Sequence, residues 1–269
     1  MPSKRDLKRV IIDTDPGIDD TAAILLALAS PELSVEAITT VYGNGPVDTC
    51  TDNVVRILLA AGRLDIPVYK GADKPLMRAA NEGWALEIHG SDVMGGTGLP
   101  LSTAQRNLPE TSHASLGIIG RVMDSPAEIT IIALGRLTNV ALALSLEPRV
   151  VQSVAEIIVM GGAVGVMRAS TDPRIKYLVS LAGMVHTAKF AAVEFGDATP
   201  DAGFMWDEED CPLAQKYVDD MNQIDSVVEL GAQVRVPWLL VHGSEDDVVP
   251  IEESHDIIAK ANQPNELFV

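Results

Sequence analysis

Apolar runs alternate along the chain with longer segments of helical character. The segments at 19–30 and 47–62 are rich in Ala, Leu and other residues that favour helices. Strand-like apolar runs lie at 9–15, 34–43, 66–71, 128–135, 156–162, 175–183 and 236–243. Continuous apolar strands separated by helices are typical of a mainly parallel sheet that is covered on both faces. The pattern therefore predicts an α/β fold of the three-layer, doubly wound, Rossmann-like kind.

The segment DTDPGIDD places four carboxylates directly after the first strand, at Asp13, Asp15, Asp19 and Asp20. In doubly wound sheets, ligands bind beyond the carboxyl ends of the strands, so this position is a candidate site. Acidic residues at a helix start can also act as caps that favour the helix dipole. Four crowded carboxylates repel one another unless a cation lies among them, and oxygen ligands suit Ca²⁺ or Mg²⁺. The segment favours a metal site, with helix capping as the alternative.

Composition excludes several classes of partner. The formal net charge of −18 disfavours binding to nucleic acid, because phosphates would be repelled. No apolar run is long enough to span a bilayer, and the first residues lack the apolar region of a secretion signal. The two cysteines have no metal-type spacing, which fits a reducing compartment. We therefore predict a cytoplasmic protein that binds neither nucleic acid nor membranes.

Several segments together are characteristic of one enzyme family. They are DTDPGIDD (13–20), TTVYGN (39–44), HGSDVMGG (89–96), ALGRLTNVALAL (133–144) and IIVMGGA (157–163). On these segments, residues from about 8 to 163 resemble the inosine–uridine-type nucleoside hydrolases, which hold Ca²⁺ with such an aspartate cluster. The resemblance implies cleavage of the N-glycosidic bond of a ribonucleoside.

The resemblance also implies roles for particular residues. Asp15 and Asp20 would ligate Ca²⁺ together with the backbone carbonyl of Leu134, and Asp15 would activate the attacking water. Ribose would be bound by Asp19 and Asn44, with His89 near the substrate. Arg136 stands where the family usually has Pro. The family's later ribose-binding segment and its His-Asp pair have no counterpart after residue 163, so we expect any Ca²⁺ binding to be weak.

The rest of the chain, from about 161 to 269, resembles the C-terminal half of an α/β-hydrolase of the serine esterase and lipase kind. MGGAVGVMRAS (160–170) resembles the helix after a nucleophile elbow, and residues 184–233 resemble a lid. VPWLLVHGSEDDVVPIEES (236–254) carries Asp246 at the place of a triad acid, although a solvated turn carboxylate is an equal alternative. No Gly-x-Ser-x-Gly string occurs, and Val159 stands where the serine would be.

Two hypotheses about function follow from these resemblances. The first is an engineered chimera of a nucleoside-hydrolase-like half (1–160) and an α/β-hydrolase-like half (161–269), joined in one combined domain with a single fused sheet. Such a chimera would lack an intact catalytic site and retain weak binding of a divalent cation or ribose. The alternative is a Ca²⁺-dependent nucleoside N-ribohydrolase. Esterase activity is disfavoured, because a triad without its Ser and His loses most of its rate advantage.

Overall fold

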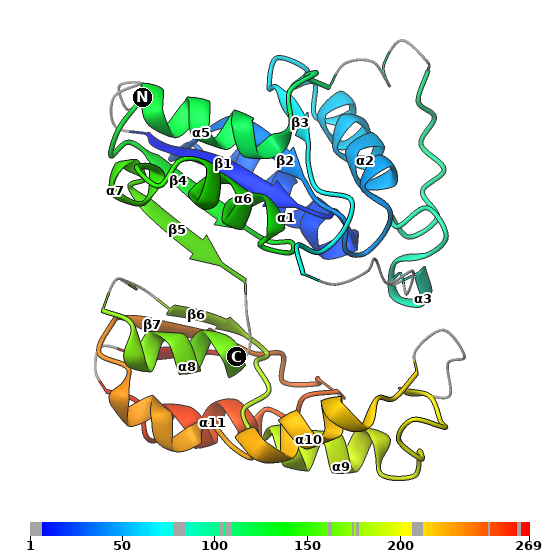
Figure 1. Cartoon of the computed structure of the whole chain (residues 1–269), viewed down its shortest axis with the longest axis vertical. Helices are drawn as coiled ribbons and strands as arrows, with labels where there is room; N and C mark the ends of the chain where they lie inside the picture. Colours follow the sequence, from blue (N-terminus) through cyan, green and yellow to red (C-terminus); the bar gives the residue numbers. More distant parts are fainter. Residues whose placement is uncertain are drawn as a thin grey trace. The chain divides into compact units, whose positions relative to one another are not determined.

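The computed structural model describes residues 7–77, 84, 86–102, 105, 109–160, 163–173, 175, 178–205, 212–246, 248–262 and 265–269. The chain divides into two compact units, Met1–Val159 and Met160–Val269 (Figure 1). Each unit has its own parallel sheet.

The first unit is built on a five-stranded parallel sheet with the order β3-β2-β1-β4-β5. Its strands are β1 (Lys8–Thr14), β2 (Leu33–Thr40), β3 (Val68–Lys70), β4 (Ile129–Ala133) and β5 (Glu156–Val159). Its helices are α1 (Ile18–Ala29), α2 (Val47–Ala60), α3 (Leu86–His89), α5 (Ala114–Asp124), α6 (Thr138–Leu146) and α7 (Val150–Ser153). The predicted parallel α/β architecture is confirmed.

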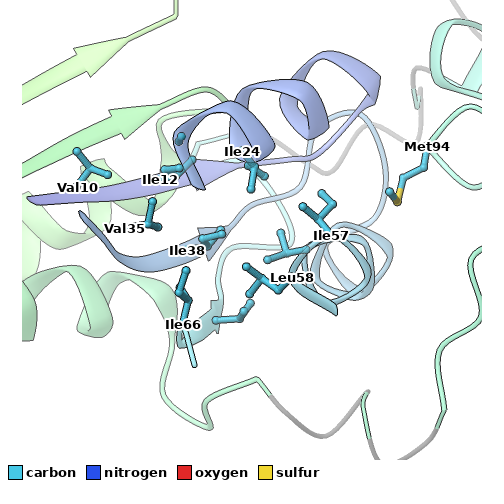
Figure 2. Packing of buried hydrophobic residues seen from close by; sticks show 12 residues of the cluster. Val10, Ile12, Ile24, Val35, Ile38, Ile57, Leu58, Ile66 and Met94 are labelled. Carbon is cyan, nitrogen blue, oxygen red and sulfur yellow. The ribbon is translucent and has the colours of Figure 1, made fainter. Parts of the chain in front are cut away.

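Helices cover both faces of this sheet. Successive strand residues point to opposite sides, so the apolar strands present side chains to helices on each face. On one face, Ile12 of β1 and Ile38 of β2 pack with Ile24 of α1 and Ile57 of α2 (Figure 2). The other face has its own buried cluster, to which α5, α6 and α7 contribute. The first unit is therefore a three-layer sandwich, as the apolar strands predicted.

The strand order places a switch point between β1 and β4. The chain winds from β1 outward through β2 to β3, then returns to the other side of β1 to form β4 and β5. In such sheets, the loops that follow the two central strands diverge and leave a crevice at their carboxyl ends. Here those loops begin at Asp15 and at Leu134.

The second unit has a three-stranded parallel sheet with the order β6-β7-β8. Its elements are α8 (Ala163–Thr171), β6 (Leu178–Leu181), α9 (Thr187–Phe195), α10 (Gln215–Ile224), η2 (Val228–Gln233), β7 (Trp238–Val241), α11 (Glu252–Ile258) and β8 (Asn265–Phe268). Trp238 and Leu240 of β7 pack with Val166 of α8 and Ile257 of α11 in a cluster of this unit. A second cluster lies around Phe195 of α9 and Met221 of α10.

The expectation of one fused sheet was wrong, because the described strands form two separate sheets. The physical reason is that each set of strands has its own core. The residues packed on β6 and β7 all come from Met160–Val269, whereas those packed on β1 and β4 come from Met1–Val159. Of the helices in the described residues, none has the length and apolarity needed to cross a bilayer.

Candidate functional site

The turn between β1 and α1 is closed by Asp20. The Asp20 carboxylate accepts hydrogen bonds from Thr14 Oγ1 at 2.6 Å and from the backbone N of Gly17 at 3.4 Å. Asp20 is buried, whereas the neighbouring Asp19 is exposed on the first turn of α1. The capping role considered from the sequence therefore applies to Asp20, and it does not exclude cation binding by the same carboxylate.

The Asp15 carboxylate is enclosed by loops that follow two other strands. Its Oδ2 accepts a hydrogen bond from the backbone N of Asn44 at 2.8 Å, and Asn44 Nδ2 donates to the Asp15 carbonyl at 3.0 Å. A Cβ added to Gly43 would overlap Asp15 Oδ2, and one added to Gly135 would lie 2.5 Å from Asp15 Oδ1. Only glycine at these two positions leaves room for the carboxylate.

Asp13 lies deeper, at the end of β1, and is fully buried. Its Oδ1 accepts from Thr39 Oγ1 at 2.6 Å and from Asn139 Nδ2 at 2.8 Å. Its Oδ2 is buried with no hydrogen-bond partner among the described residues. Asn139 also donates to the Thr40 carbonyl and accepts from the Ala72 N. One amide thus ties together the carboxyl ends of β1 and β2 and the segment after β3.

Burial raises the pKa of all three carboxyl groups, so each of them ionises less readily. It raises the pKa of Asp13 to about 6, although the bonds from Asn139 and Thr39 oppose the shift. The pKa of Asp15 rises to about 7 through burial and then through the nearby charge of Asp20, while Asn44 and Arg136 act in the opposite direction. Burial also raises the pKa of Asp20. The ionised cluster is therefore electrostatically unfavourable without a cation.

Without added metal, we expect the first unit to become less stable as the pH rises from about 4 to about 7. Because the folded-state pKa of Asp13 is raised, the folded protein binds more protons than the unfolded chain in this range, and its stability falls through the folded pKa. Asp13 alone would cost about 2–3 kcal/mol. Urea unfolding in chelator across this pH range measures the slope. A rise in stability over the same range would contradict the burial of these carboxylates.

The oxygen atoms of this site fit a hard divalent cation. Asp15 and Asp20 supply two buried carboxylates, and the charge of Asp20 raises the pKa of Asp15. The peptide of Leu134 is fixed beside them, because the N–H groups of Leu134 and Gly135 both donate to the Asp13 carbonyl, at 2.8 and 3.2 Å. Among the described residues, no three acidic, histidine or cysteine side chains form a metal-binding group. Water or substrate would complete a coordination shell of six to eight.

His89 is buried against the turn rather than directed away from it. Its Nδ1 accepts from the backbone N of Ile18 at 3.2 Å, and its ring fills the space where a Cβ of Gly17 would lie. The structure thus gathers Asp15, Asp20, Asn44 and His89 around one turn, with Leu134 beside it. Their roles toward substrate and metal remain predictions.

Asp246 belongs to the second unit, where it holds a turn. Its Oδ1 accepts from the backbone N of Val248 at 3.0 Å and of Val249 at 2.8 Å. The buried His242 donates from Nε2 to the Val249 carbonyl and bonds Ser254 Oγ through Nδ1, both at 2.7 Å, while Asp246 Oδ2 lies 3.8 Å from Nε2. These are the contacts of a turn carboxylate, and the triad role of Asp246 remains a prediction.

Several residues that build the site have no role predicted from the sequence. Gly43 and Gly135 enclose the Asp15 carboxylate and form what we call the Asp15 cradle, and Thr39 and Asn139 support Asp13. Only their position could have indicated a role, because each lies at or just after the carboxyl end of a strand, or at the start of the helix that follows it. Their chemistry alone does not distinguish them from ordinary turn residues.

Replacing Gly43 by alanine is expected to destabilise the first unit by about 1–3 kcal/mol, because the new Cβ displaces the Asp15 carboxylate. Gly120→Ala is the matched control. Gly120 lies in α5, where a Cβ would meet nothing within 4 Å, so alanine should stabilise the helix by about 0.5–1 kcal/mol. Urea unfolding compares the two variants. Equal effects of the two substitutions would show that the cradle is not close-packed.

Comparisons with known proteins point to one family. Residues 10–207 match the family model of the inosine-uridine preferring nucleoside hydrolase. The chain is 45% identical over 156 residues to a pyrimidine-specific ribonucleoside hydrolase of Citrobacter koseri, covering 58% of this chain and 48% of that protein. It is 40% identical over 161 residues to a probable uridine nucleosidase of Arabidopsis thaliana, covering 60% and 49%.

A solved plant nucleoside hydrolase is 32% identical, with a TM-score of 0.53, over 87% of this chain and 59% of that one. The chain spans about half the length of the curated relatives it matches. The family match reaches residue 207, beyond residue 163, where the resemblance was expected to end.

Proposed function

Because the chain belongs to the inosine-uridine preferring nucleoside hydrolase family, we propose that it is a Ca²⁺-dependent nucleoside N-ribohydrolase. The observation that carries the proposal is the Asp15 carboxylate, which is enclosed by two glycines, held by Asn44 and paired with the buried Asp20. Its ligand would be a small ribonucleoside. The curated relatives carry names that refer to uridine and pyrimidine ribonucleosides.

Asp15 suits the role of general base. Without a cation its pKa is about 7, and a Ca²⁺ ion beside it would keep the carboxylate ionised and able to accept a proton at neutral pH. It would accept a proton from the attacking water as the water oxygen bonds to C1′ of the ribose. The C1′–N bond breaks, and the nucleobase leaves with the electron pair of that bond and takes up a proton from solvent. Asn44 keeps the Asp15 carboxylate in one orientation during this step.

Asp15, Asp20 and the Leu134 carbonyl would hold the cation. A Ca²⁺ ion there would supply positive charge that favours the ionised carboxylates and polarises the attacking water. The exposed Asp19 and the Asn44 side chain would bind ribose hydroxyls, and such bonds help when they strengthen in the oxocarbenium-like transition state. His89 would hold the turn that carries these groups.

A second candidate is a protein that binds a cation or ribose without turnover. The observation that favours it is that, among the described residues, no third acidic, histidine or cysteine side chain joins Asp15 and Asp20 in a metal-binding group. The related hypothesis of an engineered chimera has no support, and the family match, over residues 10–207, spans the expected junction at 160/161. The likeness of residues 161–269 to α/β-hydrolases stays a prediction.

Ribose release from inosine, uridine and a nitrophenyl riboside, with Ca²⁺ or with chelator, tests the proposal. We expect turnover that chelator removes and Ca²⁺ restores. Hydrolysis of nitrophenyl acetate should be absent, because the chain lacks an esterase nucleophile motif. A Ca²⁺-dependent rise in melting temperature without ribose release would instead establish the binding-only alternative.

A further inference from the structure

Arg136 lies at the rim of the Asp15 cradle. It follows β4 in the loop that leads to α6, and its guanidinium carbon lies 4.7 Å from the centre of the buried Tyr42 ring. Each partner in this contact adjoins one of the glycines that enclose Asp15, since Tyr42 precedes Gly43 and Arg136 follows Gly135. The cation–π contact therefore joins the two loops that wall the carboxylate.

Arg136 forms no direct ion pair within the described part of the chain. Among the described residues, no carboxylate forms an ion pair with Arg136, whereas the exposed Arg149 of the same unit is paired with Glu147 at 2.6 Å. The positive charge instead lies beside the acidic site, because Arg136 directly follows Gly135, where an added Cβ would lie 2.5 Å from Asp15 Oδ1. A fixed cation that offsets this cluster also repels a mobile cation that approaches the same oxygens.

We propose that Arg136 is the charge-balancing residue of the acidic site, and that it weakens divalent-cation binding and so sets the Ca²⁺ concentration the site requires. This inference rests on the proposed function, which places the cation at Asp15 and Asp20. Arg136 is exposed, so its effect is long-range and screened by salt rather than a matter of packing. Tyr42 determines where the charge lies.

Calcium titration of the whole chain by calorimetry tests the inference. We expect Arg136→Gln to tighten Ca²⁺ binding about tenfold at low salt, because one unit charge no longer opposes the doubly charged ion. Arg136→Lys keeps the charge and should bind Ca²⁺ as the unaltered protein does. Arg149→Gln, which removes a charge already paired with Glu147, should also leave the affinity unchanged. The difference caused by Arg136→Gln should shrink at about 1 M salt, where the Debye length is about 3 Å.

Arg136→Met is a second neutral variant that can keep contact with the Tyr42 ring, and it must show the same tightening. Unchanged or weaker Ca²⁺ binding in both neutral variants would overturn the inference and leave the proposed function intact, provided that the unaltered protein binds Ca²⁺. A tightening that does not depend on salt would also overturn it, because it would indicate a packing effect. Absence of Ca²⁺ binding in every protein would overturn the proposed function and this inference together.

Discussion

Asp15→Asn is expected to lower ribose release from inosine and uridine by about a thousandfold. The asparagine keeps the volume of the side chain and an oxygen that can accept from the Asn44 backbone. It cannot take a proton from water, and general-base catalysis alone contributes about 10²–10⁴-fold. It also removes one of the two buried carboxylates proposed to hold Ca²⁺, so Ca²⁺ binding should weaken in parallel.

Asp48→Asn is the matched control for this change. Asp48 is an exposed acid of α2 that pairs with Lys70 at 2.5 Å, and such surface pairs contribute little. Its variant should retain the activity and Ca²⁺ affinity of the unaltered protein. Steady-state kinetics with calorimetric Ca²⁺ titration separates the effects. If Asp15→Asn kept more than about a tenth of the activity, the general base would have to lie elsewhere.

Asn139→Ala is expected to lower the free energy of unfolding of the first unit by about 4 kcal/mol. Three buried groups lose a hydrogen bond together: Asp13 Oδ1, the Thr40 carbonyl and the Ala72 N–H. Asp13 Oδ1 keeps its bond from Thr39, whereas the Thr40 carbonyl and the Ala72 N–H lose their bonds to Asn139, and each buried polar group left without a partner costs about 1–3 kcal/mol. The bond from Asn139 also favours ionised Asp13, so the loss should be larger at pH 7 than at pH 4.

Asn262→Ala provides a comparison for that variant. Asn262 Nδ2 also donates to two carbonyls, those of Ala232 and Val234, but Asn262 is exposed and water can replace its bonds. Its loss should cost no more than about 1 kcal/mol. Urea unfolding at the two pH values measures both variants. Similar costs for Asn139→Ala and Asn262→Ala would show that the amide does not hold the strand ends together.

The fold of the first unit could be predicted because its strands are continuously apolar. Val10 to Ile12 and the β4 residues around Ile131 are buried on both faces of the sheet. Their sequence is therefore a continuous apolar run rather than an alternation of apolar and polar residues. The division into two sheets could not be predicted in this way. An apolar strand such as Leu178–Leu181 carries no mark of which neighbour it will pair with, and only the packing of Trp238 and Leu240 identifies its own core.

The acidic part of the site was visible because four carboxylates occur in the short segment 13–20. The supporting part was not, because Gly43 follows β2 whereas Gly135 and Asn139 follow β4, and these residues reach the acidic segment only when the strands pair. The local geometry of Asp246 likewise depends on backbone N–H groups that no residue pattern displays. A cluster of acidic residues can be recognised in a sequence, whereas the groups that enclose a carboxylate such as Asp15 are brought together only by the fold.

The Asp15 cradle has a consequence for the order of folding. Its parts come from loops after β1, β2 and β4, and the bond between Asp13 and Asn139 spans 126 residues. Contacts of such high sequence separation form slowly, because a long loop must close first. A chain synthesised from its N-terminus would carry the DTDPGIDD segment long before Gly135 and Asn139 emerge. The site can therefore be completed only after β4 has joined β1.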